Sequence, residues 1–145
     1  MLLALSLSLV AAVPVITLER SVCYGTCPAY KLTIFDDGKV IYVGKEFVKQ
    51  KGKAEGRITK AELDELVREF ERINYFSLDD YYTDGPKNCP EYWTDHPSAV
   101  TSLSWKGKTK KIDHYHGCHG LPVLEQLTNL EKKIDEVVNS KRWIE

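Results

Sequence analysis

The stretch AYKLTIFDDGKVIYVG, residues 29–44, predicts a β-hairpin and sets the fold class of the chain. Tyr30, Leu32 and Ile34 alternate with other residues, as in a strand with one buried face. The residues DDG at 36–38 are a hairpin turn signal, and KVIYVG then has the composition of the return strand. Two neighbouring antiparallel strands are therefore expected here.

Further strands are predicted on both sides of this hairpin. VITLER, residues 15–20, alternates like a strand before it. Much later, AVTSLSW at 99–105 and TKKIDHYH at 109–116 flank a KGK turn and predict a second hairpin. Because these strands are locally connected, they favour an antiparallel sheet.

Two helices are expected to cover the sheet. Thr59 and Glu62 have the spacing of a capping box, and the last helix begins near Pro122, a residue that suits a first helical position. The two apolar stripes comprise Leu63, Leu66, Val67, Phe70 and Ile73, and Leu124, Leu127, Leu130, Ile134, Val137 and Val138. The fold class is thus α+β: a single domain with an antiparallel sheet of about five to six strands and two helices packed on one face.

Composition limits the classes of partner. The 145 residues suit one domain, and a content of 43% hydrophobic and 28% charged residues is typical of a soluble globular protein. The net charge of −1 provides no general attraction to nucleic acid, so no nucleic-acid partner is expected. We expect a monomer.

The first residues predict export. MLLALSLSLVAAV offers a short apolar run followed by small residues, as in a signal peptide, although no Lys or Arg precedes it. Residues 1–12 are therefore assigned to a leader and residues 13–145 to the domain. The expected location is periplasmic or extracellular, with no membrane span once the leader is removed. The alternative is a buried first strand in a cytosolic protein.

The stretch SVCYGTCPAYKLTIFDDGKVIYVG, residues 21–44, resembles an uncharacterised bacterial domain-of-unknown-function family of small exported proteins with a CYGTCPxY motif. YFSL at 75–78, TDHP at 94–97 and LEKKID at 130–135 resemble further parts of that family. The resemblance covers most of the chain after the leader. It implies a fold and a compartment, and it brings no established activity.

The four cysteines are interpreted first as disulfides, which an exported protein permits. Cys23 and Cys27 are close enough in sequence for a glycine-containing turn to join them. Cys89 and Cys118 lie in two irregular segments, and their pairing would tie residues 83–97 to the histidine-rich loop. Sequence alone leaves the connectivity open, and it also leaves open metal binding or thiol chemistry at Cys23 and Cys27.

The stretch KIDHYHGCHGLP, residues 111–122, is the candidate metal site. Ile112, His114 and His116 would share one face of a strand, so two imidazoles could bind one ion. Cys118 or His119 would add a third ligand for zinc or copper. The alternative is a polar loop whose histidines form ordinary hydrogen bonds, in which case no cofactor is expected.

The preferred function is a non-catalytic, disulfide-stabilised binding or structural module for an unidentified ligand or envelope partner. Aromatic side chains in irregular segments can provide rigid anchors for such binding. The predicted binding surface comprises Tyr24, Gly25, Thr26, Tyr92, Trp93, His96 and Tyr115. The alternatives are zinc or copper binding by the HYHGCH loop and, third, a thiol-dependent enzyme that uses Cys118 with a neighbouring histidine.

Overall fold

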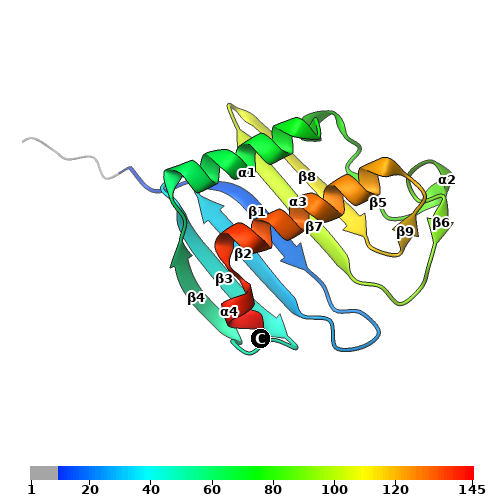
Figure 1. Cartoon of the computed structure of the whole chain (residues 1–145), viewed down its shortest axis with the longest axis horizontal. Helices are drawn as coiled ribbons and strands as arrows, with labels where there is room; N and C mark the ends of the chain where they lie inside the picture. Colours follow the sequence, from blue (N-terminus) through cyan, green and yellow to red (C-terminus); the bar gives the residue numbers. More distant parts are fainter. Residues whose placement is uncertain (1–9) are drawn as a thin grey trace, which may run out of the picture.

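The computed structural model describes residues 10–145, in which a main sheet carries two long helices on one face (Figure 1). The predicted leader at 1–12 falls for the most part outside the described residues. The strands of the sheet are β1 (Pro14–Arg20), β2 (Ala29–Phe35), β3 (Lys39–Glu46), β4 (Gly52–Arg57), β5 (Tyr81–Tyr82), β7 (Ser98–Trp105) and β8 (Lys108–Tyr115). They lie in the order β4-β3-β2-β1-β7-β8-β5.

Two long helices, α1 (Lys60–Arg72) and α3 (Pro122–Val138), cross the same face of the sheet. The shorter elements are a 3₁₀ helix (Tyr75–Ser77), α2 (Gly85–Asn88), α4 (Lys141–Ile144), and the strands β6 (Glu91–Tyr92) and β9 (Cys118–His119). The strands β6 and β9 pair with each other as a separate two-stranded sheet. The α+β class and the single domain are confirmed, and the two predicted helices correspond to α1 and α3, whereas the short helices α2 and α4 were not predicted.

The predicted sheet of about five to six antiparallel strands was too small. The sheet has seven strands and is mixed, because β5 pairs with β8 in parallel. GKAEGR in β4 contains two glycines and three charged residues, so it shows no apolar alternation. The two residues of β5 are too few for any periodicity. Both strands form because a neighbouring strand presents free backbone groups at its edge.

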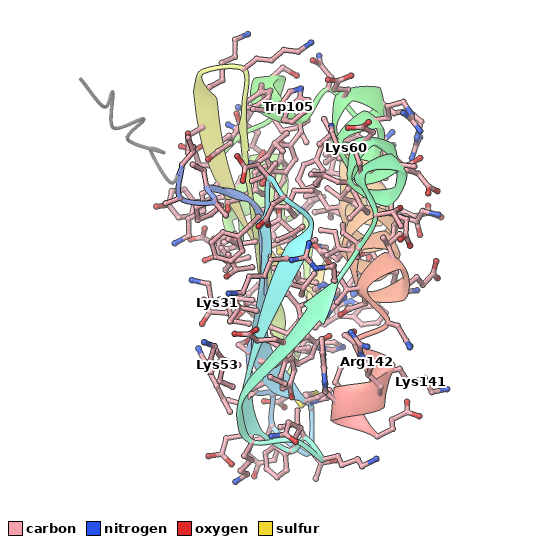
Figure 2. The ribbon with its side chains drawn as sticks, turned by 90° about the vertical axis from the view of Figure 1, so that its left-hand side faces the viewer. Lys31, Lys53, Lys60, Trp105, Lys141 and Arg142 are labelled. Atoms are coloured by element: carbon pink, nitrogen blue, oxygen red, sulfur yellow. A yellow bond between two sulfur atoms is a disulfide. The ribbon has the colours of Figure 1, made fainter. Side chains whose placement is uncertain are left out.

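The core lies between the sheet and the two long helices. Its fully buried side chains include Ile16, Leu18, Leu32, Ile34, Phe70, Leu103, Ile112 and Leu127. Alternate residues of the strands point to the other face, where Lys31 and Lys53 extend away from the helices (Figure 2). Side chains alternate between the two faces along each strand, so one face of the sheet is apolar and the other is polar.

Local sequence explains the best-defined boundaries. The Thr59 hydroxyl accepts a hydrogen bond from the Glu62 backbone N–H, and the Glu62 carboxylate accepts one from the Thr59 N–H, which completes the predicted capping box. In the β2–β3 turn, Gly38 has a φ of 86°, and a Cβ there would lie 2.3 Å from the Ile58 carbonyl oxygen. Glycine is therefore required for β2 and β3 to meet the segment that enters α1.

Within residues 10–145, no helix has the length and apolar character needed to cross a membrane.

Candidate functional site

Both predicted disulfides are present. Cys23 bonds to Cys27 within the β1–β2 connection, and Cys89 bonds to Cys118 across a sequence separation of 29 residues. All four cysteines lie within residues 10–145, and each is paired in one of these bonds. In this state no thiolate is available for the thiol-enzyme mechanism, and Cys118 cannot ligate a metal.

The Cys89–Cys118 bond ties two segments into one unit, which we call the loop end: residues 83–97 and 116–121. The strands β6 and β9 pair beside the bond. The Trp93 backbone N–H donates to the Gly117 carbonyl at 2.8 Å, and the His116 N–H donates to the Pro97 carbonyl at 2.9 Å. The loop end is therefore held both covalently and by backbone hydrogen bonds.

Gly117 makes this close approach possible. A Cβ at position 117 would lie 2.1 Å from the Trp93 carbonyl oxygen and 2.2 Å from a ring carbon of Tyr115. The Tyr115 hydroxyl donates a hydrogen bond to that same carbonyl. Any larger residue at 117 would separate the two segments.

Aromatic and imidazole rings gather on this unit. The rings of Tyr92 and Tyr115 stack with their centroids 5.1 Å apart, and the Trp93 and His119 rings lie 4.0 Å apart. The centroid of the His96 ring lies 6.2–6.5 Å from the ring centroids of Trp93, Tyr115 and His119. Tyr92, Trp93, His96, Tyr115 and His119 together are called the aromatic loop surface. Tyr92 and Trp93 remain 58% and 54% exposed.

Three residues of the predicted binding surface lie elsewhere. Tyr24, Gly25 and Thr26 form the exposed tip of the small disulfide turn, and Tyr24 is 88% exposed. The base of that turn, Cys27 and Pro28, borders a groove of about 460 Å³ that is also lined by Pro97 and His116. The structure therefore joins the turn to the loop end through a groove and keeps its tip apart from the aromatic rings.

The two predicted histidine ligands meet a carboxylate that the sequence did not single out. His114 Nδ1 donates to Glu131 Oε2, and His116 Nε2 donates to Glu131 Oε1, both at 2.7 Å. The two imidazole centroids are 4.4 Å apart. His114, His116 and Glu131 are called the histidine–glutamate cluster. As the strand alternation predicted, both imidazoles lie on the helix-facing side of β8.

The cluster is buried at its base and reachable at its edge. The side chains of Glu131 and His114 are 1% and 3% exposed, whereas that of His116 is 22% exposed. Burial alone would raise the pKa of the Glu131 carboxyl, but the hydrogen bonds from His114 and His116 outweigh it and lower that pKa. Both oxygens of the buried Glu131 side chain are therefore held by imidazole groups.

His119, the other predicted ligand, is outside this cluster. Its ring packs on Trp93, and its Nε2 is buried without a hydrogen-bond partner in the described part of the chain. A signal for Glu131 was present in the sequence. It lies four residues after Leu127 and three before Ile134, so it occupies an apolar-stripe position of the helix.

Two of the stretches that carry the family resemblance, residues 21–44 and 130–135, also meet in space. The Tyr30 hydroxyl donates to Asp135 Oδ1 at 2.7 Å, and Arg20 pairs with Asp135 Oδ2 at 2.8 Å. Tyr30 is the last residue of the CYGTCPAY stretch, and Asp135 is the last residue of LEKKID. Glu131 and Asp135 are one turn apart on α3, so both acidic residues of that motif face the sheet.

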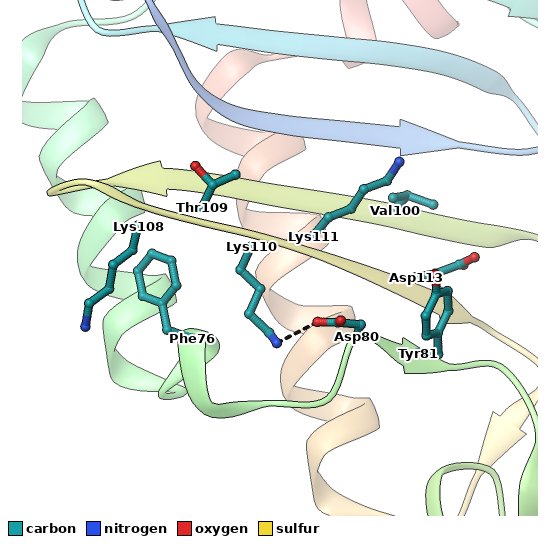
Figure 3. Close-up of a pocket in the computed structure, with 9 residues that line it drawn as sticks. All are labelled: Phe76, Asp80, Tyr81, Val100, Lys108, Thr109, Lys110, Lys111 and Asp113. Carbon is teal, nitrogen blue, oxygen red and sulfur yellow. Dashed lines mark hydrogen bonds and ion pairs between the residues drawn. The ribbon is translucent and has the colours of Figure 1, made fainter.

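A larger pocket, of about 790 Å³, lies beside β8 (Figure 3). It is lined by Lys108, Lys110 and Lys111 together with Asp80 and Asp113, and Lys110 Nζ pairs with Asp80 at 2.8 Å. None of the site residues predicted from sequence lines it. The predicted residues Tyr92, Trp93, His96, Tyr115 and His119 gather at the loop end, so we place the candidate site there instead.

Comparison with curated proteins finds no match. A family model described as "Domain of unknown function (DUF6438)" matches residues 14–138, from the start of β1 to the end of α3. This match confirms the resemblance to a domain-of-unknown-function family. The chain belongs to the DUF6438 family.

Proposed function

We propose that this protein is an exported, non-catalytic binding module that engages a partner in the cell envelope through the aromatic loop surface. The observation that carries the proposal is the exposure of Tyr92 and Trp93 on a segment fixed by the Cys89–Cys118 bond. Large aromatic side chains that remain exposed on a rigid segment can bury area on a partner with little loss of conformational entropy.

The two disulfides support the proposed location of the protein outside the cytosol. Disulfide bonds persist in the periplasm and outside the cell, whereas the cytosol keeps thiols reduced. All four cysteines are paired, and both bonds lie at the end of the sheet that carries the proposed surface. The two disulfide bonds would hold the β1–β2 connection and the loop end in place without a large apolar core beneath them.

Export is tested by expressing the full chain in bacteria and separating the periplasmic from the cytoplasmic fraction. The expected result is protein in the periplasmic fraction that, once denatured without reductant, has no titratable thiol. Recovery in the cytoplasm with four free thiols would contradict the proposed compartment.

Binding is tested with the immobilised protein and an envelope extract. The Tyr92→Ala/Trp93→Ala double variant should lose a partner that the unaltered chain retains. The matched control is Val43→Ala, which removes a side chain that is 38% exposed on the uncovered face of the sheet. Equal retention by all three proteins, or retention by none, would contradict the proposed surface.

A further inference from the structure

The histidine–glutamate cluster brings three strong metal ligands together from two elements. His114 lies in β8, His116 follows its last residue, and Glu131 lies on α3, which packs over the same face. One ligand atom from each lies within 4.8 Å of the others. In a tetrahedral zinc site, ligand atoms about 2.0–2.2 Å from the ion are about 3.3–3.6 Å from one another. Small side-chain rotations would therefore convert the observed arrangement into such a site.

The charge of the cluster favours a cation. The Glu131 carboxylate is buried, and its hydrogen-bond partners among residues 10–145 are the two imidazoles. No lysine or arginine in that range forms a salt bridge with it. A buried carboxylate requires compensation by a bonded positive group or a metal ion. A divalent ion bound between the carboxylate and the imidazoles would supply it.

We propose that His114, His116 and Glu131 form a binding site for Zn²⁺. Two imidazoles and one carboxylate are a ligand set that zinc uses, with the fourth position left for water or another ligand. His114 and His116 also line a pocket of about 470 Å³, through which an ion and a water molecule can reach the cluster. Glu125, Thr128 and Lys132 line the same pocket.

This ligand set differs from the one suggested by the HYHGCH loop. Cys118 is bonded to Cys89, and the His119 ring packs on Trp93. The set without a thiolate consists of nitrogen and oxygen donors, which favour Zn²⁺ over the softer Cu⁺. The zinc site does not depend on the proposed partner surface, because none of its three ligands belongs to the aromatic loop surface.

The test is isothermal titration of ZnCl₂ into the untagged, chelator-treated full chain, since a histidine tag would bind zinc itself. The expected result is uptake of one Zn²⁺ per chain and a rise in melting temperature with added zinc, which a chelator reverses. Co²⁺ should produce the visible absorption of a tetrahedral site. Absence of both uptake and stabilisation would overturn the proposal and leave the cluster as a buried hydrogen-bonded triad.

Variants identify the ligands. His116→Gln removes the most exposed ligand and should weaken zinc binding at least about tenfold, as loss of a metal-supporting group does. Glu131→Gln should weaken it as well and alter the Co²⁺ spectrum. His96→Gln is the matched control, because it changes a histidine outside the cluster, and it should leave binding unchanged. Circular dichroism verifies that each variant is folded. Equal zinc affinity in folded His116→Gln and the unaltered chain would overturn the proposal.

Discussion

In the sheet and its two long helices, side chains such as Ile16 and Leu103 are fully buried, whereas in the loop end Tyr92 and Trp93 are more than half exposed. The sheet has seven strands, most of them six to eight residues long, and the loop end has two strands of two residues each. Two such short strands are not stable alone. The loop end is instead joined by the Cys89–Cys118 bond and by backbone hydrogen bonds around Gly117.

The sheet with its helices and the loop end are therefore ordered in two different ways within one domain. Apolar burial stabilises the sheet and helices, and covalent cross-linking orders the segment that carries the exposed rings. Exposed aromatic groups contribute little to folding, so they are available for binding. The four predictions that follow test this division, from the largest expected effect to the smallest.

The largest effect should come from the core. Phe70 is fully buried on α1 and packs edge-on against Tyr75, with ring centroids 4.7 Å apart. Phe70→Ala should lower the free energy of unfolding by about 3–5 kcal/mol, because it removes apolar contacts and leaves a cavity. Urea denaturation measures the change. The matched control is Phe47→Ala, at a residue 49% exposed, which should change it by less than about 0.5 kcal/mol. Similar losses for both would contradict burial as the main source of stability.

The second largest effect should come from removal of the disulfide that cross-links the loop end. Replacing both Cys89 and Cys118 by alanine opens a loop whose ends are 29 residues apart. The free energy of unfolding should fall by up to about 3.5 kcal/mol in the chain-entropy model, compared with about 2 kcal/mol when Cys23 and Cys27 are both replaced. Denaturation of the two double variants under identical conditions gives the comparison. A larger loss for the Cys23/Cys27 variant would reverse the assigned importance of the two bonds.

Alkaline pH should weaken the sheet-and-helix region. Burial raises the pKa of both Tyr30 and Tyr75, with the nearby Asp135 charge adding to the effect at Tyr30. Below the unfolded pKa of about 10 both states hold the proton, so stability does not change with pH on their account. Above it the unfolded chain loses the proton first, and the free energy of unfolding falls by up to about 1.4 kcal/mol per pH unit for each tyrosine.

Denaturation of the unaltered chain and of Tyr75→Phe at several pH values above 9 measures this dependence. The variant should show a shallower decline in the free energy of unfolding, because one of the buried phenols with a raised pKa is gone. Identical slopes for the two proteins would contradict the raised pKa of Tyr75.

The smallest effect should come from the exposed rings. Trp93→Ala should change the free energy of unfolding by only about 0.5 kcal/mol, since a half-exposed side chain contributes little burial. Thermal denaturation measures it. A loss as large as that of Phe70→Ala would show that the aromatic loop surface is a second core and would remove the reason to assign it to binding.

Local patterns predicted the elements that depend on neighbouring residues. The capping box of Thr59 and Glu62 and the apolar stripe through Phe70 predicted α1, and the DDG turn predicted the β2–β3 hairpin. Such signals succeed because caps and turns are formed by residues within a few positions of each other. The pairing of Cys89 with Cys118 was also predicted, from their places in the two irregular segments.

Strands without a pattern of their own were missed. The glycine-rich and charged β4 and the two-residue β5 form because β3 and β8 present unpaired backbone groups at their edges. Backbone pairing of this kind depends on where another strand ends in space, and side-chain periodicity does not record it.

The sequence by itself determined the fold class, the two helices, the hairpins and the alternation that places His114 and His116 on one face of a strand. Only the tertiary structure decided that Glu131 is their partner and that Cys118 is not. The physical reason is that α3 packs over β8, so an acidic residue at an apolar-stripe position must find a hydrogen-bond partner on the strand beneath it. Glu131 lies 15 positions after His116 and 17 positions after His114, so no short sequence motif contains these pairs.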